Sequence, residues 1–321
     1  MWGFAFGNGK NKILTDMMDM ANRYRFSFDE YFLFDFMHLS EQERLEFIPD
    51  LERIDILEAI NLAKNQPIFD DKHLTYRIFG DYFHREVCCV LKKGGDKKKF
   101  EDFVKRQGVF VTKPFDGCCG MGVQLFSEDD YSSFDVLWEK LWQEYPKGFL
   151  AEEKIRQHQD IGRLHPESVN TLRIPSLRMD DRVIILYPRM RIGKGDMVVD
   201  NAGAGGILGV LNPETGEIIS TRDEDGNRYP THPDTGEMLV GFQIPHWQEA
   251  KDLVEELAYV LPSNRYTAWD LALAEDGWQL VEANARGQFG WQIVSQKGFR
   301  KEMEGLLREL GRPVSFLKGL Q

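Results

Sequence analysis

Two carboxylates and an amide stand near the C-terminal end of the chain, at spacings that could gather them in one site. Asp270 interrupts one apolar stretch, Glu282 ends the next, and Asn284 follows two residues later. Side chains two apart in a strand share a face, and a tight turn at 276–277 can bring Asp270 beside the other two. Such an oxygen-only set suits Mg²⁺, and a cation would offset the cost of burying the carboxylates. The alternative interpretation is a set of ordinary edge or capping residues.

A glycine-rich stretch follows a lysine in the middle third of the chain. Lys113 ends a run rich in β-branched residues, and Gly117, Gly120 and Gly122 come after it. Glycines let backbone N–H groups approach a phosphate closely, and the lysine adds a positive charge. The stretch is neither a Walker loop nor a dinucleotide-binding fingerprint, because no Gly-Lys-Ser/Thr follows and a strand is expected next. A plain glycine-rich hairpin is the alternative.

Three further groups of residues could serve the same chemistry. Lys72 is a lone upstream lysine, with an ordinary surface residue as its alternative. The run Glu152–Ile155 is either a strand whose backbone can hydrogen-bond an adenine edge or a connecting strand. Arginine forks suit carboxylate and phosphate groups. Basic and amide residues of the second half form the third group: Asn170, Arg173, Arg189, Arg191, Lys194 and Asn201.

Both helices and strands are expected to position these residues. The first 65 residues read as helical and acidic, with a capping box at Ser40 and Glu43 and with Pro49 separating two shorter helices. Strand clusters interleaved with helices and joined by hairpins predict an α+β fold with largely antiparallel sheets. The expected strands are 109–113, 123–126, 149–155, 171–179, 182–192, 207–211, 217–220, 267–274 and 278–283, and the expected helices are 72–83, 100–106, 134–145, 247–261 and 301–310.

Composition narrows the class of protein. The 321 residues carry 40 basic and 52 acidic side chains, a formal net charge of −12, and 42% of them are hydrophobic. These values suit a folded protein of roughly two domains and argue against non-specific binding to nucleic acid. We find no apolar stretch of membrane-spanning length and no signal-peptide pattern at the start. The cysteines form two adjacent pairs, Cys88-Cys89 and Cys118-Cys119, which favours reduced thiols and a cytoplasmic protein.

The order of these features resembles the ATP-grasp superfamily over roughly Asp70 to Lys297. Within it the chain is most similar to the sugar-transfer-associated ATP-grasp family. The Glu-x-Asn ending is shared with D-alanine–D-alanine ligase and the ribosomal-protein glutamate ligases. The matching stretches are His165–Ile174, Val199–Ile207, and Trp269-Asp270 with Val281–Asn284; Asn201 with Gly205-Gly206 matches the glutamate ligases in particular.

The resemblance implies an ATP-grasp fold, in which two α+β subdomains grip ATP between antiparallel sheets. The expected division is an N-terminal helical region at 1–69, a small lid subdomain at 70–157, and a large subdomain at 158–321 that holds the metal and substrate site. Two departures stand out. Cys118-Cys119 replaces smaller residues of the family loop, and residues 1–69 lack the usual N-terminal α/β domain.

The resemblance also implies cofactors and roles. ATP and Mg²⁺, with Mn²⁺ as a substitute, are the expected cofactors. The ATP phosphates would contact Lys72, Lys113, Gly117, Gly120 and Gly122. Adenine would lie against Glu152, Glu153, Lys154 and Ile155, and the ribose against Asp160, with His158 and Gln157 left open. The metal would be held by Asp270, Glu282 and Asn284. The γ-phosphate and the attacking carboxylate would face Arg173, Arg191 and Asn201, with Lys194 as a further candidate.

The implied activity is that of an ATP-dependent ligase. It would activate a small-molecule carboxylate as an acylphosphate and transfer it to an amine or hydroxyl, such as an amino acid onto a sugar or glycan precursor. A kinase that phosphorylates a hydroxyl and a non-catalytic nucleotide-binding module are the alternatives. Ligases of the superfamily are often dimers, so a homodimer is one option for this chain.

Overall fold

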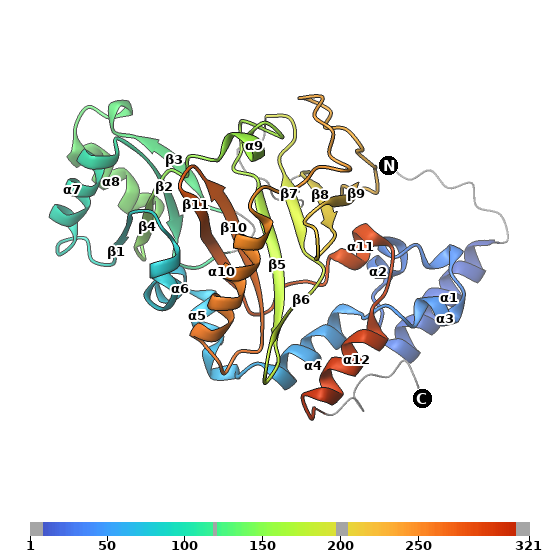
Figure 1. The fold of residues 1–321 in the computed structure, drawn as a ribbon. Coiled ribbons are helices and arrows are strands. Elements are labelled where there is room, and N and C mark those ends of the chain that lie inside the picture. The colour runs from blue at the N-terminus through green and yellow to red at the C-terminus, as the bar shows by residue number, and fades with distance from the viewer. Residues whose placement is uncertain (1–8, 118–120, 197–204, 313–321) are drawn as a thin grey trace.

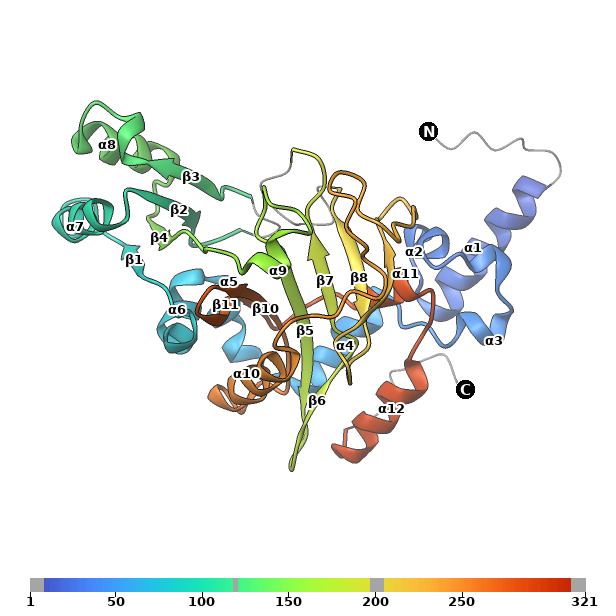
Figure 2. The same cartoon turned by 45° about the horizontal axis from the view of Figure 1, so that its top comes forward.

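The computed structural model describes residues 9–117, 121–196 and 205–312, and it contains two antiparallel sheets (Figure 1). One sheet has four strands in the order β1-β4-β2-β3, and the other has the path β11-β10-β5-β7-β8-β9 with β6 paired to β5. Figure 2 shows the first sheet to one side of the second. The predicted α+β class with antiparallel sheets is therefore confirmed.

The small sheet is covered on one face by two helices. Its strands are β1 (Val87–Val90), β2 (Val109–Pro114), β3 (Gln124–Ser127) and β4 (Phe149–Glu153), and the helices are α7 (Lys97–Gln107) and α8 (Phe134–Glu144). Alternation along β2 explains the layering, because Phe110 and Thr112 are buried on the helix side. Val111 and Lys113 consequently point away from the helices, toward the large sheet.

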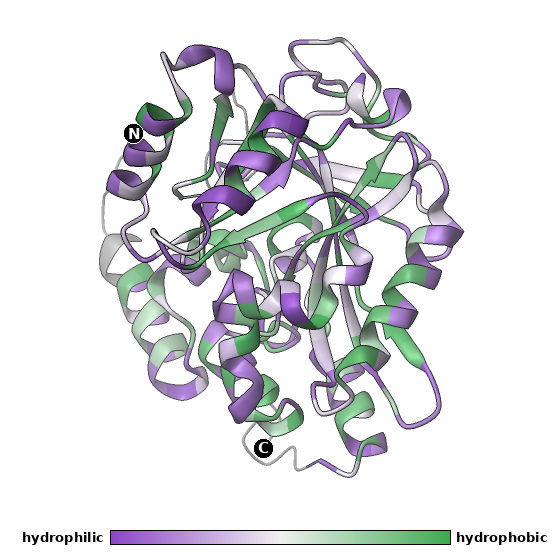
Figure 3. Ribbon diagram, turned by 90° about the vertical axis from the view of Figure 1, so that its left-hand side faces the viewer, coloured by the Kyte–Doolittle hydropathy of each residue, from purple (hydrophilic) through white to green (hydrophobic). Residues whose placement is uncertain are grey.

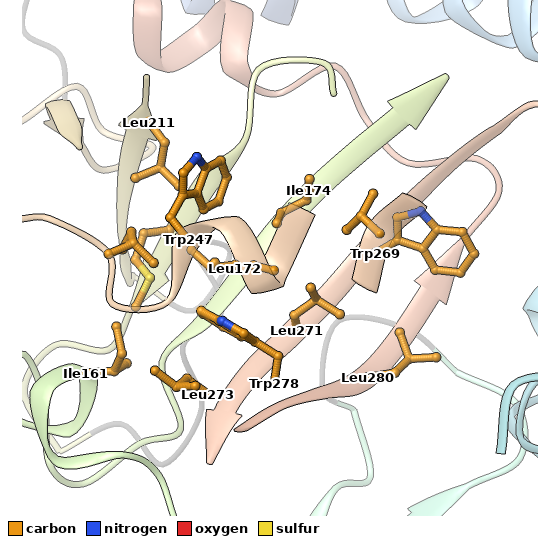
Figure 4. Close-up of a cluster of buried hydrophobic side chains, with 14 of the residues drawn as sticks. Ile161, Leu172, Ile174, Leu211, Trp247, Trp269, Leu271, Leu273, Trp278 and Leu280 are labelled. Atoms are coloured by element: carbon orange, nitrogen blue, oxygen red, sulfur yellow. The ribbon is translucent and has the colours of Figure 1, made fainter. Parts of the chain in front are cut away.

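The large sheet packs its apolar face on helix α10 (Trp247–Val260). Its strands are β5 (Thr171–Arg178), β6 (Val183–Ile185), β7 (Arg189–Ile192), β8 (Ile207–Leu211), β9 (Ile218–Arg222), β10 (Tyr266–Ala274) and β11 (Gly277–Asn284). Figure 4 shows side chains of β5 and β10, among them Leu172 and Leu271, converging with Trp247 in one buried cluster. The opposite face is apolar where Leu177 and Tyr266 pack on α4 (Asp50–Ile60), and polar where Arg173 and Asp270 line the space between the sheets.

The remaining α-helices lie along both halves of the described chain. They are α1 (Gly9–Tyr24), α2 (Phe28–Leu33), α3 (Glu41–Arg44), α4 (Asp50–Ile60), α5 (Gln66–Asp70), α6 (Lys72–Phe79), α9 (Gln159–Gly162), α11 (Trp291–Ser295) and α12 (Arg300–Glu309). The predicted capping box is confirmed, since Ser40 and Glu43 cap α3 reciprocally. The predicted break is confirmed as well, because α4 begins after Pro49. Helix α4 packs Ile56 and Leu57 against the large sheet.

Two sequence-based expectations about strands need correction. The single strand expected at 182–192 is two strands, β6 and β7, because Tyr187 adopts a left-handed backbone with φ of 44° and Pro188 follows it. Strand β1 was not expected at all; it contains Cys88 and Cys89, which are free thiols. The cysteines at 118 and 119 lie outside the described residues.

Apolar and polar residues segregate along the outer helices, as the alternating colours of Figure 3 show. No described helix combines the length and the apolar character needed to cross a membrane. The boundaries at 69 and 157 between the expected regions stay predictions.

Candidate active site

A cavity of about 1510 Å³ lies between the two sheets. It exceeds the roughly 300–1,000 Å³ of most small-molecule pockets, so it has room for more than one ligand. From the small sheet and the segment after it, the lining includes Val109, Val111, Lys113, Gly117, Glu152, Glu153, Lys154, Ile155 and Gln157. From the other side it includes Lys72, Thr171, Arg173, Arg191, Asp270, Glu282, Asn284, Gly287 and Gln288.

Three oxygen-bearing residues of one hairpin meet in this cavity. Asp270 on β10 pairs directly with Glu282 on β11, and Ala268 pairs with Asn284. The three polar side chains all line the cavity. The sequence-based expectation that this hairpin gathers them is therefore confirmed in its geometry. The pairing slips by one residue just after Asp270, where the strand register shifts.

Asp270 is fully buried and is held by two arginines. The Nε and Nη2 atoms of Arg173 donate to its two carboxylate oxygens at 2.6 Å each, and Nη2 of Arg191 lies 3.1 Å from Oδ2. Burial alone would raise the pKa of Asp270, but the two guanidinium charges outweigh it and keep the pKa below its usual value. Asp270 is therefore ionised and paired. Arg173 and Arg191, predicted to face a phosphate, reach the cavity from β5 and β7.

Glu282 lies close to a lysine from a different part of the chain. Nζ of Lys72, at the start of α6, is 3.4 Å from Oε1 of Glu282 and donates to the backbone oxygen of Gly117 at 2.7 Å. Lys72 thus connects the acidic hairpin with the turn between β2 and β3. The lysine, one of the acids and the first glycine of the loop are therefore close together in the structure.

The oxygen donors fit a hard divalent cation. The buried Nδ2 atom of Asn284 has no hydrogen-bond partner among the described residues, so its N–H groups could donate to an acceptor oxygen of a ligand. Within the described residues no group of three or more histidine, cysteine or carboxylate side chains could hold a metal ion. The set at this hairpin is instead two carboxylates and one amide, which is an oxygen-only set suited to Mg²⁺.

A buried ion cluster fixes the lysine of the small sheet. Glu152 on β4 is 3% exposed, and its Oε2 accepts from Nζ of Lys113 at 2.9 Å and from Nε and Nη2 of Arg85 at 3.0 and 2.7 Å. Burial would raise the pKa of Glu152, but the charges of Arg85 and Lys113 lower it to about 2. Arg85 also donates to the backbone oxygen of Leu280 on β11, so it joins the two sheets.

The segment after β4 offers backbone groups to the cavity. Strand β4 ends at Glu153, and both Lys154 and Ile155 line the cavity. No backbone hydrogen bond connects Lys154 or Ile155 with another described residue. An adenine edge needs such unpaired N–H and C=O groups.

Several predicted residues lie elsewhere. Lys194 is directed toward Asp223 and Tyr229, with Nζ 3.1 Å from the tyrosine hydroxyl, and it does not line the cavity. Asp160 and Gly122 do not line it either. Asn201 and Gly120 fall outside the described residues. The roles given to these residues stay predictions.

Two residues that hold side chains of the candidate site were not predicted from the sequence. Arg85 binds Glu152, 67 residues further along the chain, and no local pattern marks it. Thr171 accepts hydrogen bonds from Nε and Nη2 of Arg191, at 2.9 and 2.7 Å. Its only signal is its place at the start of a strand beside predicted site residues.

Solved structures of several ligases are similar to this chain. The ATP-grasp ligase PsnB, complexed with its precursor peptide PsnA2 and AMPPNP, has 13% identity over 79% of this chain and 63% of that chain, with a TM-score of 0.47. D-Alanyl-alanine synthetase A from Vibrio cholerae has 11% identity over 74% and 60%, with a TM-score of 0.43. N5-Carboxyaminoimidazole synthetase from Staphylococcus aureus has 10% identity over 77% and 52%, with a TM-score of 0.44.

The chain thus spans less than two thirds of each of these solved chains. No curated protein matches it. A family model described as sugar-transfer associated ATP-grasp matches residues 52–307, from within α4 to within α12. That region contains both sheets and every cavity residue named above. The chain therefore belongs to the sugar-transfer associated ATP-grasp family.

Proposed function

We propose that this protein is an ATP-dependent ligase that activates a substrate carboxylate and transfers the acyl group to an amine or hydroxyl. One observation carries the proposal. A single cavity presents Lys113 from one sheet and the carboxylate, amide and guanidinium groups of the other sheet from the opposite wall. Phosphoryl transfer depends chiefly on alignment and on neutralising charge, which such opposed walls supply.

The nucleotide would lie along the small sheet. Lys113 and Lys72 are the cations for its phosphates, and the turn that begins at Gly117 would cover them. The backbone of Lys154 and Ile155 would hold adenine, because these groups have no partner among the described residues. Glu152 contributes through Lys113, whose position it fixes.

The metal would be held by the acidic hairpin. Glu282 and Asn284 would be ligands, together with Asp270, whose carboxylate would be shared between the metal and its two arginines. A bound Mg²⁺ would neutralise charge on the ATP phosphates. The chain itself supplies the remaining positive charge, from Arg173 and Arg191.

The proposed reaction has two steps. A carboxylate oxygen of the donor attacks the γ-phosphorus of ATP, the bond to the β-phosphate oxygen breaks, and an acylphosphate and ADP result. An amine or hydroxyl then attacks the acyl carbon and gives up a proton, the bond between that carbon and the bridging oxygen breaks, and inorganic phosphate leaves with the oxygen. Arg173 and Arg191 would orient the donor carboxylate and take up charge on the transferred group. The sugar-transfer association of the family supports a sugar or glycan precursor as one of the two substrates.

A hydroxylamine trap tests this proposal. The protein is incubated with Mg²⁺, ATP, hydroxylamine and pooled amino-acid and sugar carboxylates, and products are identified by mass spectrometry. A hydroxamate formed together with ADP supports the ligase and names the donor. ADP formed with a phosphorylated hydroxyl compound would show a kinase instead.

A further inference from the structure

The central strand β7 carries a third arginine that the proposed reaction does not use. Arg189 pairs across the sheet with Arg173 on β5 and with Val210 on β8. It stands two residues before Arg191, so the side chains of all three arginines lie on the same face of the sheet. Arg173 and Arg191 line the cavity, and Arg189 lies directly beside them, just outside its lining.

Arg189 differs from its two neighbours in having no counter-ion among the described residues. Arg173 forms two hydrogen bonds to Asp270, and Arg191 contacts Asp270 and Thr171. Arg189 is only 4% exposed. Within the described part of the chain, its buried Nη1 has no hydrogen-bond partner and no carboxylate forms an ion pair with it. Asp270 pairs with Arg173 and Arg191, and no carboxylate of the described residues pairs with Arg189.

This arrangement is costly unless an anion completes it. A buried charge without a partner destabilises a fold. Burial and the nearby charge of Arg173 lower the pKa of Arg189 to about 9, so it remains protonated at neutral pH. A guanidinium presents its donors in a planar fork that matches a carboxylate. The missing partner is thus best supplied by a ligand.

We propose that Arg189 binds a carboxylate of a substrate, other than the carboxylate that ATP activates. This rests on the proposed ligase function and specifies its substrate class. The carboxylate belongs either to an acyl donor with two carboxylates or to an acceptor that carries one. The spacing supports a short molecule, because Arg189 is one strand away from Arg173, roughly 4.8 Å in the hydrogen-bonding direction. Two carboxylates on a chain of a few carbons span such a gap.

Thermal unfolding of the full chain tests binding without requiring catalysis. The probes are glutarate and L-glutamate, with butyrate and chloride at equal ionic strength as controls, each with and without Mg²⁺ and AMPPNP. We expect a dicarboxylate to raise the unfolding temperature by about 2–4 °C near saturation and butyrate to have no effect. Absence of a dicarboxylate effect under both conditions would overturn the proposal.

Three variants locate the effect. Arg189→Met should abolish the dicarboxylate shift while the free protein unfolds at the same or a higher temperature, since a buried unpaired charge is removed. Arg189→Lys keeps the charge but not the fork and should weaken binding about tenfold or more. Arg222→Met is the matched control: Arg222 lies on β9 of the same sheet and donates to the backbone of Ile293. Its dicarboxylate shift should remain. If Arg189→Met unfolds at a lower temperature and keeps the shift, Arg189 is a structural residue.

Trapping experiments then separate the two sources of the carboxylate. If Arg189→Met loses hydroxamate formation from dicarboxylates but not from monocarboxylates, the donor carries the second carboxylate. If hydroxamates still form but transfer to a carboxylate-bearing amine is lost, the acceptor carries it. Unchanged kinetics in both assays would contradict the proposal. A dicarboxylate shift in a protein that makes no ADP would leave the Arg189 site standing and the ligase function refuted.

Discussion

Arg173 and Asp270 face each other across strands β5 and β10 and are joined by two hydrogen bonds of 2.6 Å. They are 97 residues apart in the chain, and both line the cavity between the sheets. The pair places an ionised carboxylate and a guanidinium group side by side at the proposed phosphoryl-transfer site. Because Asp270 is buried, removing either partner would leave an unpaired charge inside the large sheet.

Replacing Asp270 should therefore destabilise the free protein. In Asp270→Asn, Arg173 and Arg191 lose their shared counter-charge, and we expect the free energy of unfolding to fall by about 3–5 kcal/mol. Urea denaturation without ATP or metal measures this change. A loss below about 1 kcal/mol would show that the arginines are held by other groups.

Replacing Glu282 should affect activity much more than stability. Its side chain is 32% exposed and its closest cation, Lys72, is 3.4 Å away. Glu282→Gln should therefore cost less than about 1 kcal/mol of stability. It should reduce Mg·ATP turnover by about a hundredfold or more, because a charged ligand at the phosphoryl-transfer site is lost. Normal turnover in this variant would remove Glu282 from the proposed metal site.

Stability at low pH should depend on Glu152. Its pKa is lowered from 4.5 to about 2 in the folded protein, so the ionised form stabilises the fold by about 3 kcal/mol. This contribution is complete above pH 4.5 and is lost as the pH falls toward 2. The difference in unfolding free energy between wild type and Glu152→Gln should shrink over that interval. Glu139→Gln, which removes only an exposed ion pair with Lys93, is the control. A difference that does not change with pH would contradict the pairing.

Arg85 should affect ATP use without contacting ATP. It holds Glu152, and through it Lys113, and it joins β4 to the backbone of Leu280 on β11. Arg85→Lys should lower kcat/KM for ATP by about 10–100-fold, since a displacement of Lys113 by about 1 Å misaligns the phosphates. Kinetics at saturating donor would show it chiefly as a raised KM for ATP. An unchanged KM would mean that Lys113 keeps its position without Arg85.

The sequence predicted the parts of the site that depend on local pattern. Two apolar runs with a tight turn indicate a hairpin. Strand periodicity then places Glu282 and Asn284 on one face, and Asp270 lies on that same face in the neighbouring strand, paired with Glu282. Lys113 was predicted from a strand followed by glycines, and in the structure it lines the cavity, while its role stays a prediction. The predicted α+β class with antiparallel sheets was correct because strands joined by hairpins must pair in antiparallel fashion.

What could not be predicted depends on pairing between distant strands. Arg173 and Arg191 were expected at a phosphate and Asp270 at a metal, but nothing local indicates that β5 lies between β10 and β7 and joins them. The same limit hid Arg85, whose partner is on β4, and the direction of Lys194 toward Asp223. The break between β6 and β7 depends on the unusual backbone of Tyr187, which residue type alone does not reveal.

The central claim is that a carboxylate attacks ATP to form an acylphosphate, and the path of an oxygen atom tests it most directly. The donor identified by the trap is labelled with ¹⁸O in its carboxylate and turned over with ATP and the acceptor. The account predicts that the released inorganic phosphate carries one ¹⁸O, because the bridging oxygen leaves with phosphorus when the acyl carbon is attacked. Inorganic phosphate without label, formed alongside product, would contradict it.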